Sequence, residues 1–217
     1  MPRPPRTVGD DIHYHIILRC NNKERLLCNT EDFEDFLFLL GQTKKEYLFR
    51  LYNYELLNSH IHLMISTHLG NYIDQIMHSL CFKYAKKYNK RHGRSGHVWA
   101  HRYRSRLILD DAHGIACLRY QNRNAFSAGI VERPDQWPWS GYKFYAFGEE
   151  NKLLESHPSY LSLCEDSKKR RNLYQRLVAA PIPSDKAKSV FEGRSAGESS
   201  RFLMAVQQTR RLIEKLQ

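Results

Sequence analysis

The sequence lacks several features that would point to a membrane or secreted protein. No apolar run approaches the ~18 residues that a membrane span needs, and Met1–Arg6 contains no apolar stretch like that of a signal peptide. The five cysteines form no CxxC pair and are odd in number, which argues against a disulfide framework and against a zinc site. We therefore expect reduced thiols and a cytoplasmic location.

Acidic residues are too few to balance the basic ones. The chain has 23 Asp and Glu against 34 Lys and Arg, which gives a net charge of +11. Such a charge indicates a polyanionic partner, either nucleic acid or an anionic membrane. The imbalance is sharpest in residues 83–106, which contain no acid and in which aromatic residues alternate with basic ones. Basic groups contact phosphates and rings stack on unpaired bases, so this stretch is a candidate DNA-binding surface. The alternative is a solvated basic face.

The residues that are present can form a packed core. Hydrophobic residues make up 41% of the 217 positions, with 13 Tyr, 10 Phe and 3 Trp, enough for one domain and an appendage. Periodicity and turn residues predict alternating strands and helices, with Thr30 as the first N-cap. The predicted elements are strand 12–18, helix 31–45, strands 48–57 and 60–67, helix 71–92, extended segment 98–109 and a helix from Asp110 or Asp111 to residue 126. This order predicts an α+β fold, a ferredoxin-like split β-α-β sheet with an added helix.

The residue pattern of the sequence changes after the Trp137-Pro-Trp139 segment. From about residue 150 the sequence is typical of helices joined by polar loops. We therefore predict a first domain over residues 10–147 and a helical C-terminal extension over residues 148–217, either packed on the first domain or tethered to it.

Two His-x-His pairs lie in predicted strands. Side chains alternate between the faces of a strand, so His60 and His62 point the same way while Ile61 points into the core. Two imidazoles on one exposed face can share a metal ion. His13 and His15 have the same spacing, so spacing alone does not choose between the two pairs.

The predicted helix ending near residue 126 carries a second candidate group. Tyr120 and Asn124 are four residues apart and would lie on one helical face. The Asn124 amide oxygen could then complete a metal's ligand set beside the tyrosine hydroxyl. The alternative is a buried structural tyrosine, and Tyr84 and Tyr88 are other candidates for a reactive hydroxyl.

Four segments together resemble one known family. They are Leu57–Met64 (LNSHIHLM), Gly96–Ser105 (GHVWAHRYRS), residues 118–131 (LRYQNRN and AGIV) and residues 132–140 (ERPDQWPWS). Their order and content are similar to the REP-associated tyrosine transposases, which are relatives of the HUH-class, IS200-like single-strand transposases. The resemblance covers about residues 10–147, and the extension matches only loosely.

The resemblance implies a function and a site. It implies that His60, His62 and Asn124 hold Mg²⁺ or Mn²⁺ and that Tyr120 is the nucleophile. The family cuts and rejoins single-stranded DNA through a 5′-phosphotyrosine, in DNA transposition and recombination. The partner would be single-stranded DNA with a hairpin or palindromic repeat in a bacterial nucleoid, and the protein a monomer or homodimer. An alternative is a domesticated module that binds palindromic repeats and cuts poorly. The predicted DNA-binding residues are Lys83, Lys86, Lys87, Arg91, Arg94, Trp99, Arg102, Arg104 and Arg106.

The sequence departs from the family pattern at three positions near these groups. Ser59 stands where the family usually has Asn before the first histidine, although Asn58 comes one place earlier. Gln121 replaces the usual Ile after the tyrosine, and Ala125 replaces the usual Pro after the asparagine. None of the three removes a reacting group.

Overall fold

The computed structural model describes residues 9–182 and 198–216. The chain forms two compact units. Met1–Leu51 and Leu56–Leu107 form the first, which we call the sheet unit. Tyr52–Glu55 and Ile108–Gln217 form the second, the helical unit. The units therefore divide at other positions than residue 147, and a boundary at residue 147 stays a prediction.

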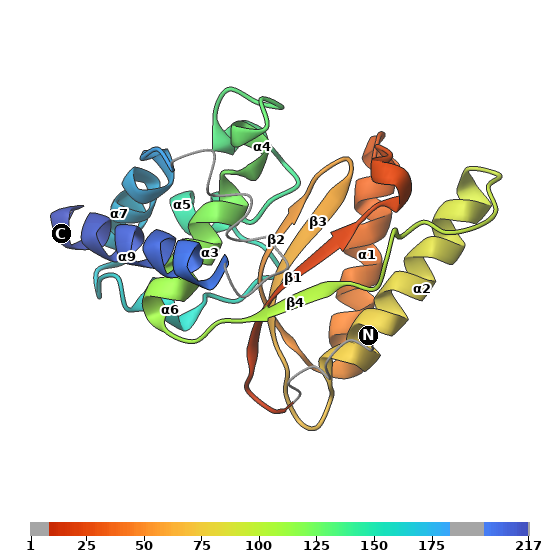
Figure 1. Ribbon diagram of the computed structural model, residues 1–217, viewed down its shortest axis with the longest axis horizontal. Coiled ribbons are helices and arrows are strands. Elements are labelled where there is room, and N and C mark those ends of the chain that lie inside the picture. The colour runs from red at the N-terminus through yellow and green to blue at the C-terminus, as the bar shows by residue number, and fades with distance from the viewer. Residues whose placement is uncertain (1–8, 183–197, 217) are drawn as a thin grey trace. The chain divides into compact units, whose positions relative to one another are not determined.

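The sheet unit has the predicted order of strands and helices. Its elements are β1 (His13–Arg19), η1 (Asn21–Lys23), α1 (Thr30–Tyr47), the two ends of β2 (Arg50–Leu56), β3 (His60–Ser66), α2 (Ile73–Arg91) and β4 (Arg104–Leu107). The middle of β2, Tyr52–Glu55, is counted with the helical unit. The strands form one sheet in the order β2-β3-β1-β4, with β1 antiparallel to both β3 and β4. This is the α+β, ferredoxin-like arrangement that the sequence predicts, with α1 and α2 side by side (Figure 1).

Local details of the sheet unit differ from the predictions. The N-cap of α1 is Asn29 and not Thr30, because the Asn29 side chain accepts a hydrogen bond from Asp32 N at 2.9 Å in a capping box. The segment 98–109 is a strand only over Arg104–Leu107. Ahead of that strand, Trp99 makes an isolated bridge with Cys20.

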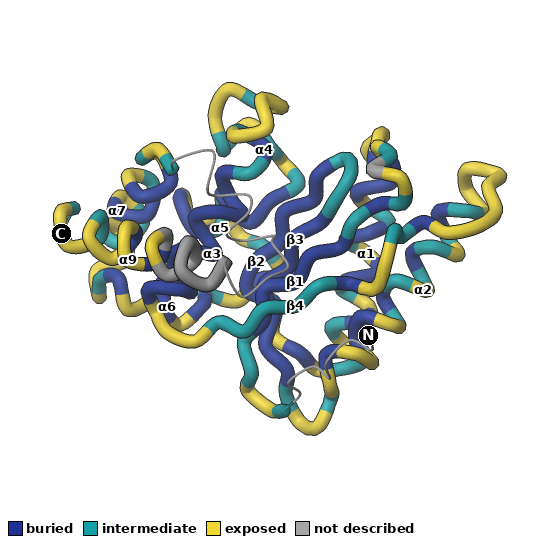
Figure 2. The backbone as a smooth tube through the Cα atoms, viewed as in Figure 1, coloured by how far each residue is buried: buried dark blue, intermediate teal, exposed yellow. Residues whose placement is uncertain are grey.

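The strand register separates the sheet into two faces. Directly opposed residues of antiparallel strands point to the same side. Ile16 faces Leu63 and Leu18 faces Ile61 across β1 and β3, and all four side chains are buried. This face forms the apolar core of the unit, and the central strands are accordingly buried in Figure 2.

The helical unit is built around α3. Its elements are α3 (Asp111–Asn122), α4 (Asn124–Ser127), η2 (Pro134–Gln136), α5 (Tyr142–Phe147), α6 (Pro158–Leu161), α7 (Ser167–Ala179) and α9 (Glu198–Leu216). Asp110 caps α3, accepting a hydrogen bond from His113 N at 2.8 Å. Every residue of α3 from 112 to 122 is buried, because α6, α7 and α9 pack on it. The extension is therefore packed rather than tethered. Among the helices of residues 9–182 and 198–216, none combines the length and apolar character that a membrane span requires.

Candidate functional site

Three histidines gather on the face of the sheet opposite its apolar core. In the register of β1 and β3, Ile17 faces His62 and Arg19 faces His60, so His15, His60 and His62 point to one side. His15 Nε2 and His62 Nδ1 share a hydrogen bond of 2.9 Å, and their rings stack with centroids 5.2 Å apart. The ring of His60 lies 5.1 Å from that of His62. The two His-x-His motifs are thus parts of one cluster, which we call the histidine face.

Burial of this cluster corrects one expectation. The sequence predicts exposed imidazoles, but His62 is fully buried and His15 is 1% exposed. Burial, with smaller effects of His60, His15 and Arg19, lowers the pKa of His62 well below 6.5. His62 is therefore neutral at neutral pH, which is the form that binds metals.

Hydrogen bonds orient both predicted metal ligands in the same way. Ser59 Oγ and His60 Nδ1 share a hydrogen bond of 3.1 Å, as His15 does with Nδ1 of His62. When Nδ1 is held by a neighbour, a metal binds at Nε2. The donor chemistry of this pair thus fits a divalent cation. In the described ranges no three His, Cys, Asp or Glu side chains gather as a metal site.

The edge strand adds positive charge to the histidine face. In the register of β1 and β4, Ile17 faces Arg104 and His15 faces Arg106. Both arginines therefore point to the side of the histidines. Arg104 and His62 both lie opposite Ile17, on the two strands that flank β1, so their backbones are about 10 Å apart. These two of the predicted DNA-binding residues lie beside the predicted metal ligands.

The basic residues of α2 do not form the unbalanced surface that the sequence predicts. Acids from α1 neutralise three of them, and an acid after β1 pairs with Arg94, which follows the helix. The local sequence does not reveal this pairing. The ion pairs are Lys83 with Glu46, Lys87 and Arg91 with Asp35, and Arg94 with Glu24. Lys86 is exposed on the same helix. Paired charges contribute less to phosphate binding, so the candidate DNA surface moves towards β4.

The rings in the 83–106 stretch have different roles. Tyr84 and Tyr88 are buried, and burial raises the pKa of each. Both belong to the core, and neither is a base-stacking group. Trp99 is half-buried, and its Nε1 donates to Cys81 O at 3.0 Å. Trp99 and Arg102 both line a groove beside α2.

The predicted nucleophile and third ligand lie in the helical unit. Tyr120 belongs to α3 and is 6% exposed. The prediction of one continuous helix to residue 126 is wrong, because α3 ends at Asn122. Arg123 is both its C-cap and the N-cap of α4, and Asn124 is the first residue of α4. Tyr120 and Asn124 therefore lie on two successive helices and do not share one face of a single helix.

A buried polar pair on β2 holds this junction. Asn53 Nδ2 donates to Gln121 Oε1 at 2.8 Å and to Asn122 Oδ1 at 3.0 Å. Glu55, two residues further along the strand, accepts from Ala125 N at 3.1 Å. Residues 121, 122 and 125 are thus fixed around Tyr120 and Asn124. Gln121 and Ala125 are two of the departures from the family pattern, and each bonds to a polar side chain of β2.

The segment from Trp137 to Gly141 completes the surroundings of Asn53. Ser140 forms an isolated antiparallel bridge with Glu55, and Gly141 N donates to Tyr54 O at 2.9 Å. A Cβ at Gly141 would clash with Asn53 Oδ1. Glycine at this position therefore leaves the space that the Asn53 side chain needs.

Two arginines beside Tyr120 attach the extension to α3. The Arg119 guanidinium donates to Leu177 O at 2.7 Å, Ala180 O at 2.8 Å and Pro181 O at 3.0 Å, and Arg123 donates to Val178 O. These carbonyls lie in the last turn of α7 and just beyond it, where the final helical carbonyls have no partner within the helix. Burial and the nearby Arg123 lower the pKa of Arg119 to about 10. The extension is thus part of the support of the helix that carries Tyr120.

Glu55 gives a prediction about stability and pH. Burial raises its pKa well above 4.5, and the bond from Ala125 N only partly opposes this. In the unfolded chain Glu55 ionises near pH 4.5, so its burial lowers stability progressively as the pH rises above that value towards the raised one. We expect Glu55→Gln, which keeps the acceptor for Ala125 N, to raise the melting temperature more at pH 8 than at pH 4.5.

A second variant and a control make that prediction specific. Glu55→Leu removes the acceptor and leaves the buried Ala125 N–H unsatisfied, which should cost about 1–3 kcal/mol. Glu150→Gln, at an exposed position, is the control and should leave the dependence of melting temperature on pH unchanged. Equal melting temperatures of Glu55→Gln and the unmutated protein at both pH values would contradict a raised pKa.

Comparisons with known proteins agree with these observations. A family model described as "Transposase IS200 like" matches residues 9–120. The structure of a REP-associated tyrosine transposase bound to a REP hairpin is similar with a TM-score of 0.57 at 18% identity, covering 72% of this chain and 93% of that one. A candidate transposase of Deinococcus radiodurans R1 has a TM-score of 0.41 at 14% identity, covering 52% of this chain and 91% of that one. No curated protein matches. The likeness to the hairpin-bound structure shows that the chain has the HUH fold.

Proposed function

Since the chain belongs to the IS200-like transposase family, we propose that it binds single-stranded DNA and cuts and rejoins it through a 5′-phosphotyrosine at Tyr120. The observation that carries this proposal is the histidine face. Two imidazoles, each with its Nδ1 held by a neighbour, lie beside two arginines that suit phosphates. A merely structural role would not require three neighbouring histidines, two of them buried, on the same face as cationic residues.

The proposed reaction conserves the energy of the phosphodiester. The Tyr120 oxygen loses its proton and forms a bond to phosphorus, while the bond from phosphorus to O3′ breaks and O3′ gains a proton. A 3′-hydroxyl can later attack the phosphotyrosine, and the bond to Tyr120 then breaks. Resealing therefore needs no ATP. The reference pKa of tyrosine is about 10, so deprotonation must be assisted, and the rigid support of α3 would hold the hydroxyl in place for attack.

A divalent cation, Mg²⁺ or Mn²⁺, is part of the proposal. His60 and His62, with the Asn124 amide oxygen, would hold the cation, whose charge makes the phosphorus of the scissile phosphate more electrophilic. Arg104 and Arg106 would bind flanking phosphates. The neighbouring structure bound to a REP hairpin supports a hairpin-bearing strand as the partner.

A cleavage assay tests the proposed function. The DNA is a 3′-labelled single strand that carries the inverted repeat flanking the gene, incubated with Mg²⁺ or Mn²⁺. The proposal predicts a free 3′-hydroxyl on one fragment, protein attached to the other, and joining to a second 3′-hydroxyl without ATP. Hairpin binding without any cut would indicate a domesticated binding module. Repeated turnover without attached protein would indicate a hydrolase that uses water.

The edge-strand arginines give a prediction about binding. We expect Arg104→Ala with Arg106→Ala to weaken hairpin binding and to flatten its salt dependence, because each lost phosphate contact lowers the slope of log affinity against log salt by roughly 0.7–0.9. Lys87→Ala with Arg91→Ala is the control, since it removes the same charge from residues paired with Asp35. An equal loss of slope in both double variants would place phosphate binding on α2 as well.

A further inference from the structure

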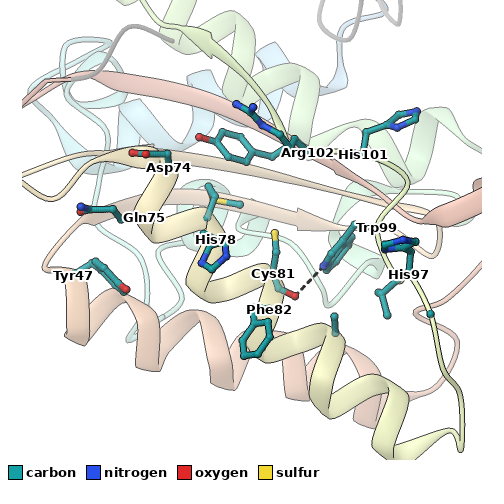
Figure 3. Close-up of a pocket in the computed structure, with 15 residues that line it drawn as sticks. Tyr47, Asp74, Gln75, His78, Cys81, Phe82, His97, Trp99, His101 and Arg102 are labelled. Carbon is teal, nitrogen blue, oxygen red and sulfur yellow. Dashed lines mark hydrogen bonds between the residues drawn. The ribbon is translucent and has the colours of Figure 1, made fainter. Parts of the chain in front are cut away.

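A groove in the sheet unit is not used by the proposed cleavage chemistry. It has a volume of about 810 Å³ and lies between α2 and the segment 96–103 that leads into β4. Figure 3 shows the labelled side chains of α2 and those of the following segment around this space. The volume is in the range of small-ligand sites. The groove is formed by the Gly96–Tyr103 segment, one of the segments that resemble the transposase family.

The groove is lined with rings. Seven of its fifteen lining residues carry one: Tyr47, His78, Phe82, His97, Trp99, His101 and Tyr103. His78 and Phe82 are four residues apart on α2, and their rings are parallel within 5° with centroids 6.4 Å apart. Phe82 is 63% exposed, so much of its ring is open to a partner in the groove. Such rings suit the face of a nucleobase.

The polar lining residues suit the rest of a nucleotide. Asp74 and Gln75 lie in the first turn of α2 and are exposed in the groove. A carboxylate accepts hydrogen bonds from base amino groups, and a glutamine amide can pair with adenine through two hydrogen bonds. Arg102, from the other wall, suits a phosphate. Arg104 follows two residues later on the edge strand, so the strand of DNA has cationic contacts beyond the groove.

We propose that this groove binds one unpaired nucleotide of the DNA, with its base against the rings of His78 and Phe82 and its edge bonded to Asp74 and Gln75. This inference rests on the proposed function only in taking single-stranded DNA as the partner. In a duplex both faces of every base are covered by its neighbours, so only an unpaired base can lie on these rings. Asp74 suits a base that carries an amino group, and Gln75 favours adenine.

Fluorescence of 2-aminopurine tests the proposal. The probe is a hairpin with unpaired flanks that carries 2-aminopurine at one unpaired position at a time. The protein carries Tyr120→Phe, so that no cleavage complicates binding. We expect protein binding to change the fluorescence of one position through ring stacking. Phe82→Ala should remove that change and weaken binding roughly 5- to 150-fold. Gln75→Ala should remove the preference for adenine at the same position, measured by competition with unlabelled hairpins that differ only in that base.

The control is Phe38→Ala, which removes a ring of similar exposure (58%) from α1, outside the groove. It should leave fluorescence and affinity unchanged. If no position depends on Phe82 while the unmutated protein still cuts DNA, the groove proposal is overturned and the proposed function stands. If the unmutated protein cuts no DNA and yet one position depends on Phe82, the proposed function is overturned and the groove proposal stands. Binding of free dAMP that does not compete with the hairpin, or equal competition by duplex DNA or RNA, would overturn DNA as the source of the nucleotide.

Discussion

Replacing Tyr120 with phenylalanine should abolish DNA cleavage and the covalent adduct while leaving hairpin binding near its original affinity. The change removes only the hydroxyl, so the buried ring still packs within α3. Loss of one buried hydrogen bond would cost about 1 kcal/mol of stability. Loss of an essential nucleophile should reduce cleavage roughly 10⁴-fold or more. Gel assays of cleavage and adduct, with binding and melting temperature measured on the same samples, separate these effects.

Tyr84→Phe is the matched control for that variant. Tyr84 is also buried, and its hydroxyl donates to Asp32 O at 3.3 Å, so its removal should cost similar stability. The Tyr84→Phe protein should cut DNA and form the adduct normally. If instead Tyr84→Phe lost the adduct and Tyr120→Phe kept it, the nucleophile would lie on α2 and the role of Asn124 as a ligand would lose its support.

Replacing His60 with alanine should remove both cleavage and tight Mn²⁺ binding. His60 is only half-buried, so its loss should leave the sheet unit folded, whereas His62→Ala would create a cavity in a fully buried site. Residues that orient metal ligands typically contribute 10–100-fold to affinity. We therefore expect His15→Ala to weaken Mn²⁺ binding by roughly that factor and His60→Ala to weaken it further.

Electron paramagnetic resonance of free Mn²⁺ measures this affinity independently of activity. His68→Ala is the control, because His68 follows β3 and pairs with Asp11 at 3.6 Å, away from the histidine face. It should bind Mn²⁺ like the unmutated protein. Unchanged binding in both His60→Ala and His15→Ala would contradict the assignment of the metal to this face.

The order of elements and the fold could be predicted because they depend on local patterns. Alternating residues of β1 and β3 and helical spacing in α1 and α2 are visible in the sequence, and they are confirmed. The strand register could not be predicted. It joins His15 to His62 and places Arg104 and Arg106 beside them. The second His-x-His motif, His13 to His15, was the available signal for this cluster. In the sequence alone it is an alternative to His60 and His62 as the metal site, and not a part of the same site.

The ion pairing of α2 could not be predicted for a related reason. The stretch 83–106 has no acids of its own, yet Asp35 and Glu46 of α1 pair with its lysines and arginines. Such pairing depends on how two helices pack, so it cannot be predicted from the local sequence.

Two of the three departures from the family pattern, Gln121 and Ala125, also depend on tertiary contacts. Ser59 bonds to His60, Asn53 bonds to Gln121, and Glu55 bonds to Ala125. Proline has no N–H. The alanine at position 125 can therefore donate to Glu55, whereas the family's usual proline could not. The signal was two polar residues, Asn53 and Glu55, in an otherwise apolar or aromatic stretch of β2. Each departure is therefore matched by a partner that keeps its surroundings bonded.

Mass spectrometry can locate the covalently attached DNA on the unmutated protein. The protein is incubated with its hairpin-bearing single strand and Mn²⁺, digested with nuclease and protease, and analysed by mass spectrometry. If Tyr120 is the nucleophile, one nucleotide-modified peptide should be found, with the 5′-phosphate on the oxygen of Tyr120. A modified peptide that places the phosphate on another residue, or cleaved DNA with no modified peptide at all, would contradict this assignment.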